Sequence, residues 1–236
     1  MEIRRQRENT TVLEMRFKRV PNCFVLICTI ALGAVAAPTD TTNLDWFGVS
    51  GPPPKVLNRG LSSLTENGQT YLHFDEHAGD GLGWWPDIKF TNGTIEFDVR
   101  GKDLAQKSFV GVAFRGLDEL TYDAVYFRPF NFKADDPVRR SHGVQYIAHP
   151  DFGWEKLRAE HPNKYEDEVS PAPEPNGWFH VRIVVESPNV RVFVNNAEKP
   201  CLQVEQLSNR KTGWVGIWAG NGSDGDFANL KLTPAL

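Results

Sequence analysis

Hydrophobic and polar residues alternate with a period of two over most of the chain. In residues 94–100, TIEFDVR, every second residue is apolar. The same period recurs in residues 109–116 (FVGVAFRG), 178–187 (WFHVRIVVES) and 189–196 (NVRVFVNN). This period is typical of half-buried antiparallel strands, and turn sequences such as TNGT, NNAEKP and NGSDGD separate the runs. The pattern predicts an all-β protein, a two-sheet antiparallel sandwich of roughly a dozen strands.

One stretch, residues 149–178, breaks the alternation. Residues 154–161, WEKLRAEH, predict about two helical turns that stop before Pro162. The SPAPEP stretch that follows reads as an extended linker. We therefore predict a short helical insertion at about residues 150–177. A connection of this length in a sandwich more often serves function than simply joins two strands.

The N-terminal residues 1–36 combine a basic segment with an apolar one. The basic residues are Arg4, Arg5, Arg7, Arg16, Lys18 and Arg19. The uncharged run CFVLICTIALGAVAA follows, and it contains the small-x-small pattern Ala34-Val35-Ala36. These features are typical of a secretory signal peptide, whereas the apolar run is short for a retained anchor, the alternative interpretation. We predict a signal peptide at 1–36, with Met15 as an alternative start, and one domain at 37–236. The protein is then secreted or periplasmic, with no membrane attachment after cleavage.

Charge and cysteine content limit the function classes for residues 37–236. Six of the 26 basic and three of the 30 acidic residues lie in 1–36, which leaves 20 basic and 27 acidic residues and a net charge of −7. An acidic domain without a basic patch argues against a nucleic-acid partner. Of the three cysteines only Cys201 lies in this part, so an intramolecular disulfide is excluded and we expect a buried thiol.

Three stretches carry a resemblance to a known superfamily. They are FVGVAFRG, WFHVRIVVESPNVRVFVNN and GWVGIWAGNGSDGDFANLKL, which together span much of residues 109–232. They resemble strands of the concanavalin A-like lectin/glucanase superfamily, and within it the laminin-G-like branch and the 3-keto-disaccharide hydrolase-like domain. The resemblance implies a jelly-roll sandwich with a glycan site on its concave sheet face. It also implies a carbohydrate, an oligo- or polysaccharide, as the partner.

A candidate ligand-binding face follows from the alternation. If Val125 and Phe127 face the core, Tyr126 and Arg128 point the other way. The same rule turns Arg115 outward, and in GVQYIAHP it places Gln145 and His149 on one face. We predict that Arg115, Tyr126, Arg128, Gln145 and His149 line one ligand site on a floor of glycine and alanine. The alternative is a merely solvated sheet face, and a single β-bulge would change which residues belong to it.

The sequence leaves two enzymatic alternatives open. Family 16 glycoside hydrolases of this superfamily use carboxylates on alternate strand positions, about 5 Å apart for retaining chemistry. Here Glu96 and Asp98 match that pattern, but Arg100 stands where the acid is required. The alternative implied by the 3-keto-disaccharide hydrolase resemblance is elimination from a keto sugar, as a hydrolase or lyase. It requires a base, for which His149, Asp123 and His142 are candidates, and a cation such as Arg115 or Arg128 beside the enolate.

The remaining candidates concern calcium and protein partners. Asn221, Asp224 and Asp226 offer oxygen ligands of the kind that calcium binds, although GNGSDGDF also reads as a tight loop before a strand. We expect no required cofactor, with calcium as the alternative. A laminin-G-like module that binds protein through its loops is the third function that the sequence leaves open.

Overall fold

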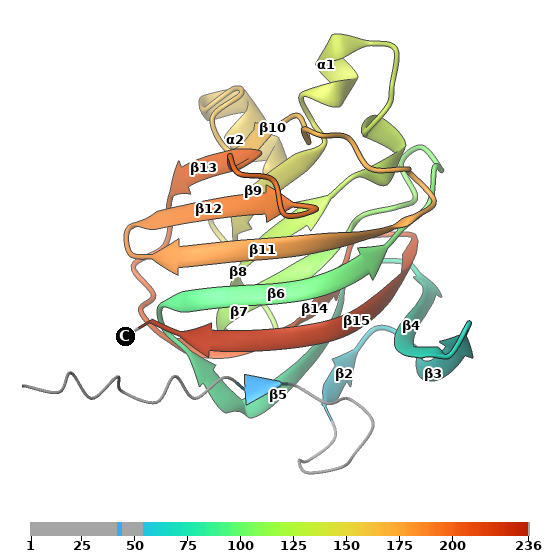
Figure 1. The fold of residues 1–236 in the computed structure, drawn as a ribbon. Coiled ribbons are helices and arrows are strands. Elements are labelled where there is room, and N and C mark those ends of the chain that lie inside the picture. The colour runs from blue at the N-terminus through green and yellow to red at the C-terminus, as the bar shows by residue number, and fades with distance from the viewer. Residues whose placement is uncertain (1–41, 44–53, 236) are drawn as a thin grey trace, which may run out of the picture. The chain divides into compact units, whose positions relative to one another are not determined.

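The computed structural model describes residues 42–43 and 54–235. The predicted signal peptide and its cleavage site lie outside these residues, so export stays a prediction. Two antiparallel sheets form the described part (Figure 1). The front sheet has the order β13 (Leu202–Glu205), β12 (Asn189–Val194), β11 (Trp178–Glu186), β6 (Gly93–Arg100), β15 (Ser223–Pro234), β4 (Gln69–His77) and β3 (Leu61–Glu66), and β1 (Thr42–Asn43) also pairs with β15.

The back sheet carries the strands on which the ligand-binding prediction rests. Its order is β10 (Glu166–Asp167), β9 (Val144–Ala148), β8 (Thr121–Phe127), β7 (Val110–Asp118), β14 (Gly213–Ala219), β5 (Gly81–Phe90) and β2 (Lys55–Leu57). The strands β7, β8 and β9 are therefore neighbours, as the predicted site requires. The all-β, two-sheet jelly-roll prediction is confirmed.

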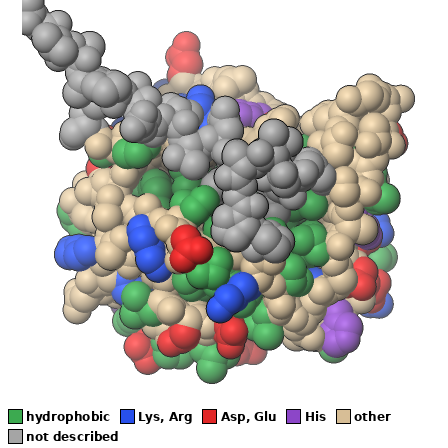
Figure 2. All heavy atoms as spheres, turned by 90° about the horizontal axis from the view of Figure 1, so that it is seen from below, with side chains coloured by type: hydrophobic (Ala, Val, Ile, Leu, Met, Phe, Trp, Pro, Cys, Tyr) green, Lys and Arg blue, Asp and Glu red, His purple; other side chains and the backbone are tan. Residues whose placement is uncertain are grey.

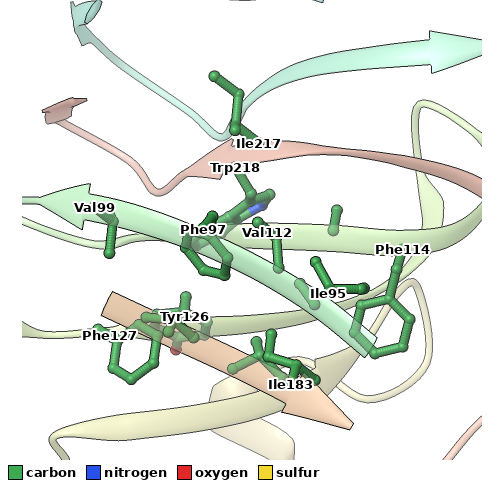
Figure 3. Close-up of a cluster of buried hydrophobic side chains, with 14 of the residues drawn as sticks. Ile95, Phe97, Val99, Val112, Phe114, Tyr126, Phe127, Ile183, Ile217 and Trp218 are labelled. Atoms are coloured by element: carbon green, nitrogen blue, oxygen red, sulfur yellow. The ribbon is translucent and has the colours of Figure 1, made fainter. Parts of the chain in front are cut away.

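The core fills the space between the two sheets (Figure 3). From β6 the side chains of Ile95, Phe97 and Val99 are fully buried, and they belong to the same core cluster as Val112 of β7 and Ile217 of β14. Each such side chain stabilises the fold by about 1.5–3 kcal/mol on burial. Two-residue alternation produces this core, because it turns every second side chain of both sheets inward.

Three short helical segments complete the fold: η1 (Pro129–Asn131), α1 (Pro137–Arg140) and α2 (Trp154–Glu160). The elements α1, α2 and β10 lie near one another at one end of the sandwich, at the top of Figure 1. The helix predicted over 154–161 is confirmed as α2, which packs its buried Leu157 against the protein. No helix among the described residues is both long and apolar enough to cross a bilayer.

The opposite end of the sandwich is shown in Figure 2, which views the molecule from below. On this face the described basic and acidic side chains are mixed, and neither sign gathers into a large patch.

Candidate functional site

A pocket of about 600 Å³ opens on the outer face of the back sheet. Its floor includes Tyr126 of β8, Ile147 of β9 and Trp218 of β14, and α2 contributes Trp154 and Arg158 to its wall. Further lining residues come from the short helices η1 and α1 (Phe130, Asn131 and Arg139) and from loops (Asp80, Phe109, His142, His149 and Asn221). We call this site the outer-face pocket.

The strand register explains why Tyr126 reaches the outer face of the back sheet. Val125 and Phe127 of β8 are buried in the core, so Tyr126 between them turns outward. Gly111 of β7 pairs with Tyr126, and a Cβ on Gly111 would come within 2.6 Å of the Tyr126 Cα. Ala113 likewise pairs with Ala124. Gly111, Ala113 and Ala124 therefore lie beside Tyr126 in the sheet, but all three are buried and none of them lines the pocket.

Aromatic rings continue across the outer face from the pocket. The Tyr126 and Trp218 ring centroids are 4.8 Å apart, and Trp218 Nε1 donates a hydrogen bond of 3.2 Å to the Tyr122 hydroxyl. Trp214 packs 5.8 Å from Tyr122 and 5.5 Å from Trp84. All five side chains are buried. The pocket floor is thus the end of a packed aromatic layer and not a loosely solvated strand face.

A buried hydrogen-bond network links three of the predicted ligand-binding residues. Arg128 Nη2 donates to the Tyr126 hydroxyl at 2.7 Å and also to Gln145 Oε1. The Tyr126 hydroxyl donates to Gln145 Oε1 at 2.8 Å. Arg128 Nη1 donates to the His142 carbonyl at 3.0 Å. Burial raises the pKa of Tyr126 to about 12, so its hydroxyl keeps its proton at neutral pH.

Glu166 of β10 anchors a second cluster beside Arg128. Arg158 donates two hydrogen bonds to its carboxylate, at 2.9 and 2.6 Å, and Arg128 Nη1 lies 3.6 Å from it. His142 Nδ1 lies 2.9 Å from Glu166 Oε2, in an orientation that does not make a hydrogen bond. Burial favours protonation of Glu166, but Arg158 outweighs it and holds the pKa of this carboxyl below its usual value.

His149 and Asp80 lie in the same pocket. Burial lowers the pKa of His149 below 6.5, against the opposing effect of Asp80, whose Oδ2 lies 3.9 Å from His149 Nε2. The imidazole is therefore neutral at pH 7 and able to accept a proton. Burial also raises the pKa of Asp80 above 3.8, although His149 and Arg59 oppose the shift.

Three sequence candidates, Arg115, Asp123 and Gln145, do not line this pocket; Gln145 is fully buried and reaches it only through its hydrogen bonds to Tyr126 and Arg128. The register of β7 shifts after Phe114, and Arg115 adopts φ 52° at that irregularity. Its guanidinium donates to Thr91 O and to side chains of Asn92, Ser187 and Gln206. The expectation that Arg115 shares the face of Tyr126 is wrong, because the bulge turns the side chain away.

Asp123 lies on β8 at a position that alternation turns away from Tyr126. Its carboxylate accepts hydrogen bonds from Arg210 Nη2 at 2.5 Å and Ser208 Oγ at 3.0 Å. Burial raises its pKa, against the opposing effects of Arg210 and Ser208. Asp123 is fully buried and does not line the outer-face pocket. Of the candidate bases, the pocket therefore contains His149 and His142 only.

The chain matches a known sequence family over most of its length. The sequence profile of the 3-keto-alpha-glucoside-1,2-lyase-like domain family matches residues 40–233. The chain belongs to this family. No curated protein matches the sequence.

Solved structures with the same fold differ strongly in sequence. The carbohydrate-binding module CBM66 from Bacillus subtilis has a TM-score of 0.53 and 12% identity, covering 76% of this chain and 95% of its own. The VIP36 exoplasmic/lumenal domain, in a form bound to Ca²⁺ and mannose, has a TM-score of 0.56 and 12% identity, covering 83% and 90%. A Bacillus subtilis protein of unknown function with a galectin-like fold has a TM-score of 0.53 and 11% identity, covering 78% and 90%. At these identities the likeness shows the fold.

The calcium candidates have other partners in this family member. Asn221 Oδ1 accepts a hydrogen bond from Gly79 N at 2.7 Å. Asp224 pairs with Lys102, and Asp226 pairs with His73 at 2.7 Å and Arg100 at 2.8 Å. Within residues 54–235, no three His, Cys, Asp or Glu side chains gather into a metal-binding group. Calcium binding stays a prediction.

Sequence reasoning missed several pocket residues. Trp154 and Arg158 lie in the insertion that was predicted to be functional, so their helix was expected but their place in the wall was not. Glu166, in the same insertion, does not line the pocket, but its pairing with β9 buries it beside Arg128. Asp80 stands in the turn before β5 and carried no signal in the sequence. Asp80, Trp154 and Arg158 are distant from Tyr126 in the sequence, and the fold brings them into one pocket.

Proposed function

We propose that the protein binds a saccharide in the outer-face pocket. The observation that carries the proposal is the buried Arg128–Tyr126–Gln145 network at the base of a pocket with aromatic walls. Saccharides present rigid arrays of hydroxyl groups and flat apolar ring faces. The Arg128 guanidinium and the Tyr126 hydroxyl match the hydroxyl groups, and the rings of Trp154 and Phe130 match the apolar ring faces.

The dimensions of the pocket support a small ligand. About 600 Å³ lies within the range of roughly 300–1,000 Å³ that is usual for small-molecule sites. This volume fits one or two sugar rings better than it fits a long polysaccharide chain. CBM66 and the mannose-bound VIP36 domain share the fold, which is consistent with a saccharide partner.

A second candidate function, favoured by family membership and by neutral His149, is elimination from a 3-keto glycoside. The His149 imidazole would take the proton on C2, which the neighbouring ketone acidifies. The electron pair of the C2–H bond would form the C1=C2 bond, and the C1–O bond would break. The departing alkoxide would take a proton and leave as an alcohol, and Arg128 would stabilise charge on the C3 oxygen.

A thermal-shift screen with a panel of mono- and disaccharides, including 3-keto forms, tests the binding proposal. A saccharide that binds the native state raises the midpoint of unfolding. The Arg128→Lys variant is measured in parallel, because lysine keeps the charge but loses the planar array of donors. We expect the shift in the wild type and a smaller one in the variant. A panel without any shift would oppose the proposal and favour the laminin-G-like, protein-binding alternative.

Product analysis separates binding from elimination. Each saccharide that binds is incubated with the wild type and with His149→Gln, and the released alcohol or sugar is measured. Release by the wild type that His149→Gln abolishes supports elimination. Binding without release supports a saccharide-binding module.

A further inference from the structure

The base of the outer-face pocket contains more positive than negative charge. Arg128 and Arg158 share one buried carboxylate, that of Glu166. Glu166 is 3% exposed, and both of its short hydrogen bonds come from Arg158. Burial lowers the pKa of His142 beside them, so this imidazole is neutral at pH 7. The three charged side chains therefore sum to one excess positive charge.

The other charged groups that line the pocket do not remove this excess. Arg139 and Glu155 are both exposed and opposite in sign. Asp80 lies near His149 and interacts with Arg59, a buried cation outside the lining. The excess therefore stays at Arg128, which is 5% exposed and lines the pocket.

Hydrogen-bond donors are also in excess around Arg128. The Gln145 carbonyl oxygen already accepts from both Tyr126 and Arg128. The amide nitrogen of Gln145 is buried and has no hydrogen-bond partner in the structure. A buried donor without an acceptor and a buried cation with a shared counter-ion both cost free energy. A ligand group that brings negative charge and acceptor oxygens would relieve the second cost.

This local excess is opposite in sign to the whole chain, whose net charge is −4. The negative net charge repels anionic ligands at long range, whereas the local excess at Arg128 attracts an anionic group at short range. A neutral sugar would gain nothing from this excess. Guanidinium groups bind carboxylate and sulfate oxygens with charge-assisted hydrogen bonds.

We infer that the saccharide bound in the outer-face pocket carries an oxyanion, a carboxylate or a sulfate, that lies against Arg128. The inference rests on the proposed saccharide binding and narrows the class of sugar. The remainder of the sugar then lies toward Trp154 and the pocket opening.

A series of charge variants tests the inference. Glu166→Gln raises the formal charge at the pocket base from +1 to +2, and Arg158→Gln lowers it to zero, while Arg128 is retained in both. Titration calorimetry compares methyl glucoside, methyl glucuronide, glucose 6-sulfate and inorganic sulfate on each full-length variant. The readout is the ratio of anionic to neutral affinity within one variant, so a general loss of binding cancels. Circular dichroism melting confirms that each variant folds.

We expect this ratio to exceed one in the wild type, to rise about tenfold in Glu166→Gln and to fall about tenfold in Arg158→Gln. The glucuronide and sulfate arms show which oxyanion is preferred. A ratio near one throughout, with the neutral sugar bound, would overturn the inference and leave saccharide binding intact. Inorganic sulfate that binds as tightly as the sugar sulfate would overturn it too, because the sugar would then contribute nothing. If none of the four probes binds, both proposals fail for these sugars.

Discussion

Replacing Arg115 with methionine should destabilise the protein strongly without touching the outer-face pocket. The guanidinium is fully buried and makes five hydrogen bonds of 2.6–3.0 Å, to Thr91 O and to the side chains of Asn92, Ser187 and Gln206. Methionine fills much of the same volume but donates no hydrogen bond. The four acceptor groups then lose their shared donor inside the protein.

The magnitude follows from those contacts. A hydrogen bond to a charged group contributes about 1.5–3 kcal/mol net, and bonds that share one guanidinium are not additive. Removing the charged centre of a buried network typically costs about 3–5 kcal/mol. With a urea m-value of about 2 kcal/mol/M, the unfolding midpoint should fall by about 2 M.

Urea unfolding followed by tryptophan fluorescence measures the change. Arg191→Met is the matched control, because Arg191 is partly exposed and its pair with Glu186 lies at the surface. Such a pair contributes about 0–1 kcal/mol. If Arg115→Met and Arg191→Met lower the free energy of unfolding equally, the structural role assigned to Arg115 is incorrect.

Three further predictions concern single groups. Tyr126→Phe removes the hydroxyl between Arg128 and Gln145 and should cost about 1–2 kcal/mol in urea unfolding; an unchanged midpoint would mean that the network contributes no stability. Because burial lowers the pKa of His149 below 6.5, its neutral form stabilises the fold above that pH, and this contribution is lost as the pH falls through the lowered pKa. His149→Gln should therefore lose less stability than the wild type between about pH 7 and about pH 5, and parallel profiles would count against the shift. Burial raises the pKa of Cys201 to about 12, so iodoacetamide should label this thiol only after unfolding, as peptide mapping would show; rapid native labelling would contradict its burial.

Strand alternation was enough to predict the sandwich and to turn Tyr126 toward the outer face of the back sheet. In β8 the period of two is unbroken, and it correctly separated Tyr126 from Val125 and Phe127. In β7 the period breaks at Arg115, where a single left-handed residue redirects the side chain. Nothing in FVGVAFRG marks that position, because bulges depend on the partner strand as much as on the local sequence.

The pocket walls depend on long-range contacts that periodicity does not encode. Asp80 and His149 are far apart in the sequence, yet their side chains lie 3.9 Å apart. Glu166 looks like one of several acidic residues in KYEDEV, and only its pairing with β9 makes it the buried partner of Arg158. Residues of this kind become identifiable only once the fold shows which distant segments pack against the back sheet.

Saccharide binding in the outer-face pocket is the central claim, and a calorimetric titration of Trp154→Ala against the wild type tests it most directly. Trp154 is 44% exposed on the pocket wall, so its removal should leave the fold intact. Leu120→Ala, at an exposed hairpin turn that does not line the pocket, is the control. We predict that the saccharide that best stabilises the wild type binds Trp154→Ala about fivefold more weakly, a loss of about 1 kcal/mol, and binds Leu120→Ala unchanged. Equal affinity for all three proteins would contradict the account.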